Sequence, residues 1–133
     1  MKDAEIILKM IETVDPKDIS AIQEIEARVF CWVIREKPPI SYAELSKQIS
    51  FVGGVPEYCT SRDALKAVRP QGWWFTIEPT GWHEDWWKVS AVTQKYGSHV
   101  VLENEAHIQT EELAELHAII QAIAHERAEV GAA

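Results

Sequence analysis

The feature that most constrains the fold of this chain is a change in hydrophobic period at residues 70–72, a Pro-Gln-Gly triplet. Before this triplet, apolar residues recur with the 3.6-residue spacing of amphipathic helices. After it, apolar and polar residues alternate with a period of two, which is typical of strands with one buried face. The sequence therefore predicts an α+β fold in which helices come first and a sheet follows.

The first 35 residues are expected to form two helices. Apolar side chains fall at helical spacing up to Val14, and Asp15-Pro16 then interrupts the pattern. A second helix is predicted to start near Lys17 or Asp18 and to pack antiparallel to the first. We assign its charged residues to a solvated face or to the edge of its apolar stripe; these are Glu24, Glu26, Arg28 and Arg35.

Residues 36–57 are interpreted as a connector or insertion. Two consecutive prolines near its start lock their φ angles and make a stiff link. Ser41 and Glu44 then have the spacing of a capping box, which predicts a short helix that ends near Ile49. A Gly-Gly-Val-Pro segment breaks this helix before the next one begins.

The remainder, residues 58–133, is expected to form an α-β-β-β-α core. Thr60 and Asp63 have the spacing of an N-cap pair and open a short helix, and Thr110 caps a closing helix. Three strands are predicted between these helices, at residues 73–78, 86–93 and 99–103. The apolar stripe of the closing helix consists of Leu113, Leu116, Ile120, Ile123 and Ala124.

The predicted architecture is one α+β domain over residues 1–133. A helical lead-in, residues 1–35, precedes the connector, and a three-stranded antiparallel β-meander packs with the C-terminal helix. We expect the layers to form an α/β/α-type sandwich.

Composition excludes several broad classes of protein. With 13 Lys and Arg against 21 Asp and Glu, the formal net charge is −8, so the chain lacks the positive field of a general nucleic-acid or anionic-membrane binder. The sequence contains no run of about 18 apolar residues, the length needed to span a membrane. Its opening residues are too acidic for a secretory signal. Cys31 and Cys59 are the only cysteines and have no CxxC spacing, which is typical of a cytosolic protein with free thiols.

Residues 58–73 carry a family resemblance. They contain Tyr58 with the small hydroxyl residues Thr60 and Ser61, a short helix with Asp and Ala, and a Gly-Trp pair that opens a strand. This pattern resembles the signature of the phage ABA sandwich domain proteins, a family of small phage and prophage proteins. The chain departs from the family at residues 40–55, which look like an insertion, and in its density of tryptophans after the Gly-Trp pair. The resemblance implies a phage or prophage accessory protein that works in the host bacterial cytoplasm, and it implies no catalytic residue set.

Five of the six tryptophans lie between residues 73 and 87. Large aromatic residues of paired strands commonly pack in a core. However, Trp73-Trp74 and Trp86-Trp87 are consecutive pairs, so each pair places one ring on either face of a sheet. Unless both faces are covered, one ring of each pair is exposed, and exposed aromatic rings suit a planar ligand or a protein partner.

An anion site next to these tryptophans is a second candidate. Thr60 and Ser61 carry hydroxyls at a predicted helix start, where free backbone amides can bind phosphate. Arg62, Lys66 and Arg69 follow at i, i+4 and i+7 on one helical face. A helix cap with a solvated basic face is the plainer interpretation of the same residues. The candidate ligand-binding residues are therefore Thr60, Ser61, Arg62, Lys66 and Arg69, with Trp74 and Trp82 as stacking platforms.

No set of residues has the spacing of a catalytic or metal site. The His-Glu-Asp run at residues 83–85 lies in a predicted loop, and successive residues rarely converge on one ion. His117 and His125 are about two turns apart on one helix and are interpreted as edge-of-core residues. Cys59 precedes a helix start but has no histidine base close to it in the sequence. We therefore predict no metal, no cofactor and no enzyme activity.

Three classes of function are open at this point. The first is a non-catalytic binding protein that counters host defence by sequestering a nucleotide-type signalling molecule. The second is a protein-interaction module that blocks a host factor through exposed tryptophan and its net negative charge. The third is an enzyme, such as a hydrolase that uses residues 83–85. The sequence favours the first narrowly over the second, and the apolar stripes of the N-terminal helices leave a homo-oligomer open.

Overall fold

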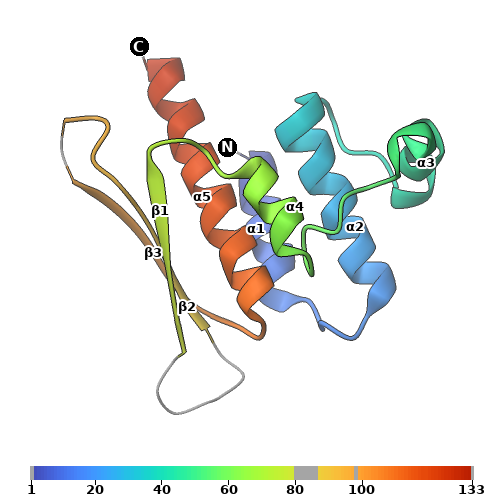
Figure 1. Cartoon of the computed structure of the whole chain (residues 1–133), viewed down its shortest axis with the longest axis horizontal. Helices are drawn as coiled ribbons and strands as arrows, with labels where there is room; N and C mark the ends of the chain where they lie inside the picture. Colours follow the sequence, from blue (N-terminus) through green and yellow to red (C-terminus); the bar gives the residue numbers. More distant parts are fainter. Residues whose placement is uncertain (1, 80–86, 98, 133) are drawn as a thin grey trace.

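The computed structural model describes residues 2–79, 87–97 and 99–132 and has the predicted α+β class (Figure 1). None of the described helices is long and apolar enough to cross a membrane. The elements in chain order are α1 (Lys2–Thr13), α2 (Ile19–Phe30), a π-helical turn η1 (Cys31–Arg35), α3 (Tyr42–Gln48), a 3-10 turn η2 (Ser50–Val52), α4 (Arg62–Val68), β1 (Trp73–Pro79), β2 (Trp87–Thr93), β3 (Val100–Ile108) and α5 (Glu111–Ala132).

The first two helices are separated at Asp15-Pro16, as predicted. The Asp15 carboxylate accepts a hydrogen bond from the Lys17 amide at 2.9 Å. Asp18 then caps α2, because its carboxylate accepts from the Ala21 amide at 3.2 Å. These two local bonds turn the chain, and α2 runs back antiparallel to α1 (Figure 1).

The predicted cap of α3 is present, since the Ser41 hydroxyl accepts from the Glu44 amide at 3.2 Å. Ser41→Ala leaves this amide without its acceptor, so we expect the free energy of unfolding to fall by about 0.5–2 kcal/mol. Ser41→Asp keeps an acceptor at the same position and is the matched control. Urea denaturation measures both variants, and an unchanged midpoint for Ser41→Ala would refute the capping role.

The three strands form an antiparallel meander in the order β1-β2-β3. Thr93 of β2 pairs with Trp73 of β1 and with Val100 of β3. The third strand continues past its predicted end at residue 103. Residues 104–107 lack the apolar alternation on which that prediction was based, and backbone hydrogen bonds to β2 extend the strand without it.

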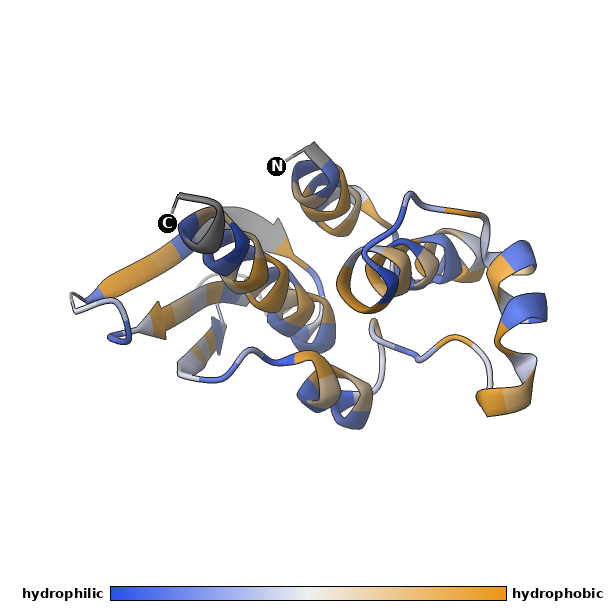
Figure 2. Cartoon of the chain, turned by 90° about the horizontal axis from the view of Figure 1, so that it is seen from above, coloured by the Kyte–Doolittle hydropathy of each residue, from blue (hydrophilic) through white to orange (hydrophobic). Residues whose placement is uncertain are grey.

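The order of the layers differs from the predicted α/β/α sandwich. Figure 1 shows the helices on one side of the sheet, with α5 directly against it. Both α1 and α4 pack against α5, α2 packs on α1, and α3 packs on α2 (Figures 1 and 2). The layers are therefore sheet, helix and helix, and no helix of the described residues covers the outer face of the sheet.

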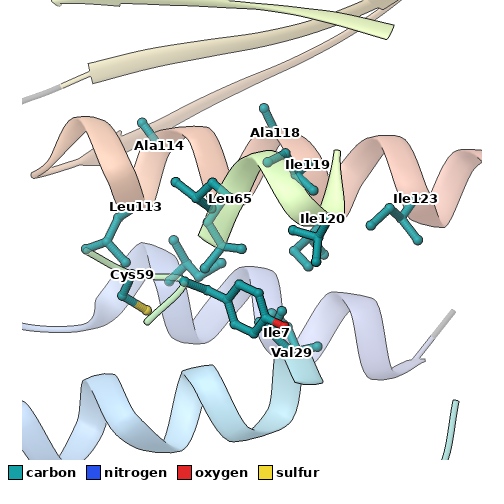
Figure 3. Close-up of a cluster of buried hydrophobic side chains, with 14 of the residues drawn as sticks. Ile7, Val29, Cys59, Leu65, Leu113, Ala114, Ala118, Ile119, Ile120 and Ile123 are labelled. Carbon is teal, nitrogen blue, oxygen red and sulfur yellow. The ribbon is translucent and has the colours of Figure 1, made fainter. Parts of the chain in front are cut away.

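The reason for this order is that α5 is buried on nearly all sides. Of residues 113–123, all except Gln121 are buried. Figure 3 shows Ala114 and Ala118 directed toward the sheet and Leu113 directed toward the N-terminal helices. Small residues allow the sheet to approach the helix closely, while larger ones fill the space between helices. The predicted stripe of α5 is thus only one side of a helix that lies at the centre of the core.

Two groups of buried side chains hold these layers together. The larger group draws on α1, α2, α4, all three strands and α5, so the N-terminal helices and the sheet share one core. A smaller group attaches the connector to α2 and consists of Ala27, Cys31, Leu45, Ile49 and Val55.

Candidate functional site

Two of the three basic residues predicted on α4 are engaged with α5. Arg62 forms an ion pair with Glu111, and Arg69 forms one with Glu115. The Glu115 residue is only 2% exposed, so this second pair lies at the edge of the core. Lys66 lies between the two arginines and is exposed. The expected basic face therefore serves mainly to attach α4 to α5.

The amides expected to bind phosphate are satisfied within the chain. The amides of Thr60 and Ser61 donate to the Glu57 carbonyl oxygen at 3.1 and 2.8 Å. The Ser61 hydroxyl accepts from the Ala64 amide at 3.3 Å, so Ser61 is the N-cap of α4. The predicted pairing of Thr60 with Asp63 is wrong by one residue, because Ser61 is the last residue with extended backbone before the helix.

Trp74 lies on the opposite face of the sheet from α4 and α5. The neighbouring Trp73 is buried and Phe75 packs against the core, whereas Trp74 is 51% exposed. The expected single pocket of Trp74 and the α4 residues is therefore not formed, because alternate side chains of a strand point to opposite faces. Trp82 and residues 83–86 lie outside the described residues. The stacking role of Trp82 and the loop at residues 83–85 therefore stay predictions.

An apolar row crosses the outer face of the sheet. Trp74 of β1 pairs with Val92 of β2, and Val92 pairs with Val101 of β3. Val92 is half-buried, and Val101 is 43% exposed. We call these three side chains the outer apolar row. The adjacent row on the same face is polar and consists of Thr76, Ser90 and Glu103.

The described thiols and buried histidine are poorly suited to catalysis. Both cysteines are free and buried. Burial, together with the Glu26 carboxylate, raises the pKa of the Cys59 thiol, which keeps the thiol protonated at neutral pH. His117, expected at the edge of the core, is fully buried; burial lowers its pKa although Glu12 lies 3.4 Å from its Nε2. The described ranges contain no group of three or more His, Cys, Asp or Glu side chains arranged to hold a metal ion.

A groove of about 790 Å³ lies between α2, α3 and the segment that follows η2. We call it the α2–α3 groove. Two carboxylates line it, Glu26 from α2 and Glu57 from the segment before α4, together with the Tyr42 ring of α3. Gly53 and Gly54 form its rim and have φ angles of 101° and 85°, a left-handed conformation that favours glycine.

Glu26 is a candidate functional residue that the sequence analysis misplaced. It is only 4% exposed, and its Oε2 accepts a hydrogen bond from the Cys59 amide at 3.1 Å. Burial raises the pKa of Glu26 to about 7. The nearby Glu57 carboxylate raises this pKa further, whereas the hydrogen bond from Cys59 lowers it. The expected solvated position is wrong, because Glu26 follows Ile22 by four residues and precedes Val29 by three. That spacing within the apolar stripe is the signal that could have placed it inside.

No family model, no curated protein and no solved structure matches the chain. The resemblance of residues 58–73 to the phage ABA sandwich domain proteins therefore stays a prediction.

Proposed function

We propose that this chain is a non-catalytic protein-interaction module that binds its partner through the outer apolar row. The observation that carries the proposal is the exposure of Trp74 beside Val92 and Val101, on a sheet face that none of the described helices covers. An exposed tryptophan buries a large apolar area on binding and is the residue type most enriched in interaction hot spots.

The surroundings of the row also suit a protein contact. The polar row beside it ends in Glu103, whose carboxylate lies 4.0 Å from the Lys88 ammonium group. An apolar centre with a charged border is the usual anatomy of a protein interface. The net charge of −8 favours a partner with a basic surface.

The nucleotide-sequestration hypothesis, which the sequence favoured, has less support from this geometry. A phosphate at the start of α4 would have to compete with the ion pairs of Arg62 and Arg69. It would also have to displace the Glu57 carbonyl from the amides of Thr60 and Ser61. We therefore place the interaction module first. The resemblance to phage accessory proteins makes a host protein in the bacterial cytoplasm the partner we propose.

Trp74→Ala is the test of this function. The immobilised chain is used to isolate a partner from bacterial lysate, and calorimetry with the purified partner then gives the dissociation constant. We expect Trp74→Ala to weaken binding at least about tenfold, since hot-spot truncations exceed about 1–2 kcal/mol. Thr76→Ala, on the same strand and face but in the polar row that borders the outer apolar row, is the matched control and should weaken binding much less than Trp74→Ala does.

The same calorimetry includes a panel of cyclic and linear nucleotides. Wild-type binding to a nucleotide, weakened by both Arg62→Ala and Trp74→Ala, would overturn the interaction module in favour of sequestration. Mass spectrometry of small molecules released by heating the purified protein provides an independent check. A bound nucleotide found in this way would also favour the sequestration hypothesis over the interaction module.

A further inference from the structure

We propose that the α2–α3 groove binds an organic cation through an alkylammonium group, of the kind that a polyamine or a lysine side chain carries. The groove is formed by α2, α3 and residues 50–57, and none of these elements contributes to the outer apolar row. The inference is therefore independent of the function proposed above.

The Glu26 carboxylate is buried without a counter-ion from the described residues. Only its Oε2 accepts a hydrogen bond, from the Cys59 amide, and no ion pair joins Glu26 or Glu57 to a basic side chain of the described ranges. A buried carboxylate is strongly disfavoured unless a cation or further donors compensate it. A cation in the groove would supply both.

A second polar group without a partner lies at the same groove. The Ser46 residue of α3 lines it, and the Ser46 Oγ is buried without a hydrogen-bond partner in the described chain. Buried hydroxyls are almost always hydrogen-bonded, so an orphaned one beside a groove leaves room for a further polar partner. An ammonium group carries three N–H donors, which the two carboxylates can accept. The Ser46 hydroxyl has almost no accessible surface, so it joins them only if its side chain turns toward the groove.

The number of carboxylates and the apolar residues that line the groove favour an alkylammonium group over a metal ion. Calcium takes six to eight oxygen ligands, several of them usually carboxylates. The groove offers two carboxylates and the neutral side chains of Gln23, Ser46 and Ser50, and no third acidic, His or Cys side chain of the described residues joins them to hold a metal ion. Val52, Val55 and Pro56 supply apolar surface for a methylene chain, and the Tyr42 ring can face the charged head. This combination matches a flexible aliphatic chain that ends in an ammonium group.

Binding should depend on pH through Glu26. Its pKa, raised to about 7 mainly by burial, means that protons compete with the cation near neutrality. Because the cation needs the ionised carboxylate, affinity should rise as the pH increases from about 6 to 8. The other titratable groups at this carboxylate and groove are Tyr42, Glu57, Tyr58 and Cys59, and burial raises the pKa of Tyr58 to about 12, so that Tyr58 remains protonated in this range.

The experiment titrates the full chain with spermidine and, separately, with a lysine-containing peptide, and follows the amide NMR signals of Gly53 and Gly54 at pH 8. We expect saturable shifts with at least one probe. Glu26→Gln should weaken binding at least about tenfold, the loss expected for a charged hydrogen bond. Glu44→Gln removes an exposed carboxylate of α3 that does not line the groove, and it should leave the affinity unchanged.

Glu26→Gln is close in shape to the wild type and can still accept from Cys59. If it fails to fold, Glu57→Gln, at an exposed position, takes its place and should weaken binding severalfold. A response to spermidine alone assigns the site to polyamines, and a response to the peptide alone assigns it to lysine side chains. The proposal is overturned if neither probe shifts these signals, if both glutamine variants bind as the wild type does, or if calcium binds more tightly than either probe.

Discussion

Trp73→Ala is expected to lower the free energy of unfolding by about 3–5 kcal/mol, the range measured when a buried tryptophan is truncated. Trp73 is the first residue of β1 and is 8% exposed, and its side chain lies between the sheet and α5. Its Nε1 donates to Glu126 Oε1 at 2.7 Å, and its ring meets the His125 ring edge-on at 5.7 Å. The substitution therefore opens a cavity and also removes a hydrogen bond that ties the sheet to α5.

Trp74→Ala is the matched control for this prediction, since the two residues are adjacent in sequence and on opposite faces of one strand. Half of the Trp74 side chain is exposed, so we expect a loss of less than about 1 kcal/mol. Guanidinium denaturation followed by far-UV circular dichroism measures both variants. Equal losses would contradict the assignment of the two rings to different faces.

Arg69→Ala is expected to lower the free energy of unfolding by about 3 kcal/mol. The Glu115 side chain is 3% exposed, and Arg69 is its ion-pair partner. Removing one member of a buried pair leaves a charge inside the protein without compensation, which typically costs about 3–5 kcal/mol. We expect the lower end because the Arg69 side chain is 40% exposed. The substitution also removes the guanidinium group 5.5 Å from the Phe75 ring centroid.

Arg62→Ala is the control here, because its ion pair joins the same two helices. The side chains of Arg62 and Glu111 are 57% and 38% exposed, and exposed pairs contribute about 0–1 kcal/mol. The double variant Arg69→Met/Glu115→Leu replaces both charges by apolar side chains, so it should recover much of the stability that Arg69→Ala loses. A loss in Arg69→Ala that equals the one in Arg62→Ala would show that burial of Glu115 does not matter.

Part of the candidate binding surface could be predicted from the sequence. The Trp73-Trp74 pair required one ring on each face, and the outer position of Trp74 follows directly from that alternation. The composition of the outer apolar row did not follow, because it depends on the register that places Val92 beside both Trp74 and Val101. The α2–α3 groove was missed because Glu26 was judged by its charge, and not by its place in the apolar stripe.

The sequence by itself determined the features that depend on a few neighbouring residues. The break at Asp15-Pro16, the cap at Ser41 and the change of period before β1 are all of this kind. Gly72, at that change of period, has a φ of 81°, and a Cβ there would lie 2.9 Å from the Lys95 side chain. Local backbone preferences and short hydrogen bonds act within one turn, so the residue types there are sufficient to predict them.

Only the tertiary structure decided which charged groups are paired and which face of the sheet is covered. Glu115 lies 46 residues from Arg69, and Cys59 lies 33 residues from Glu26, so no local spacing reveals either contact. Apolar residues lie on more than one side of α5 between residues 113 and 123, so the N-terminal helices pack on the side of α5 away from the sheet. The face of the sheet toward α5 carries buried apolar side chains from all three strands, among them Trp73, Val89 and Ile108, so apolar burial places α5 on that face.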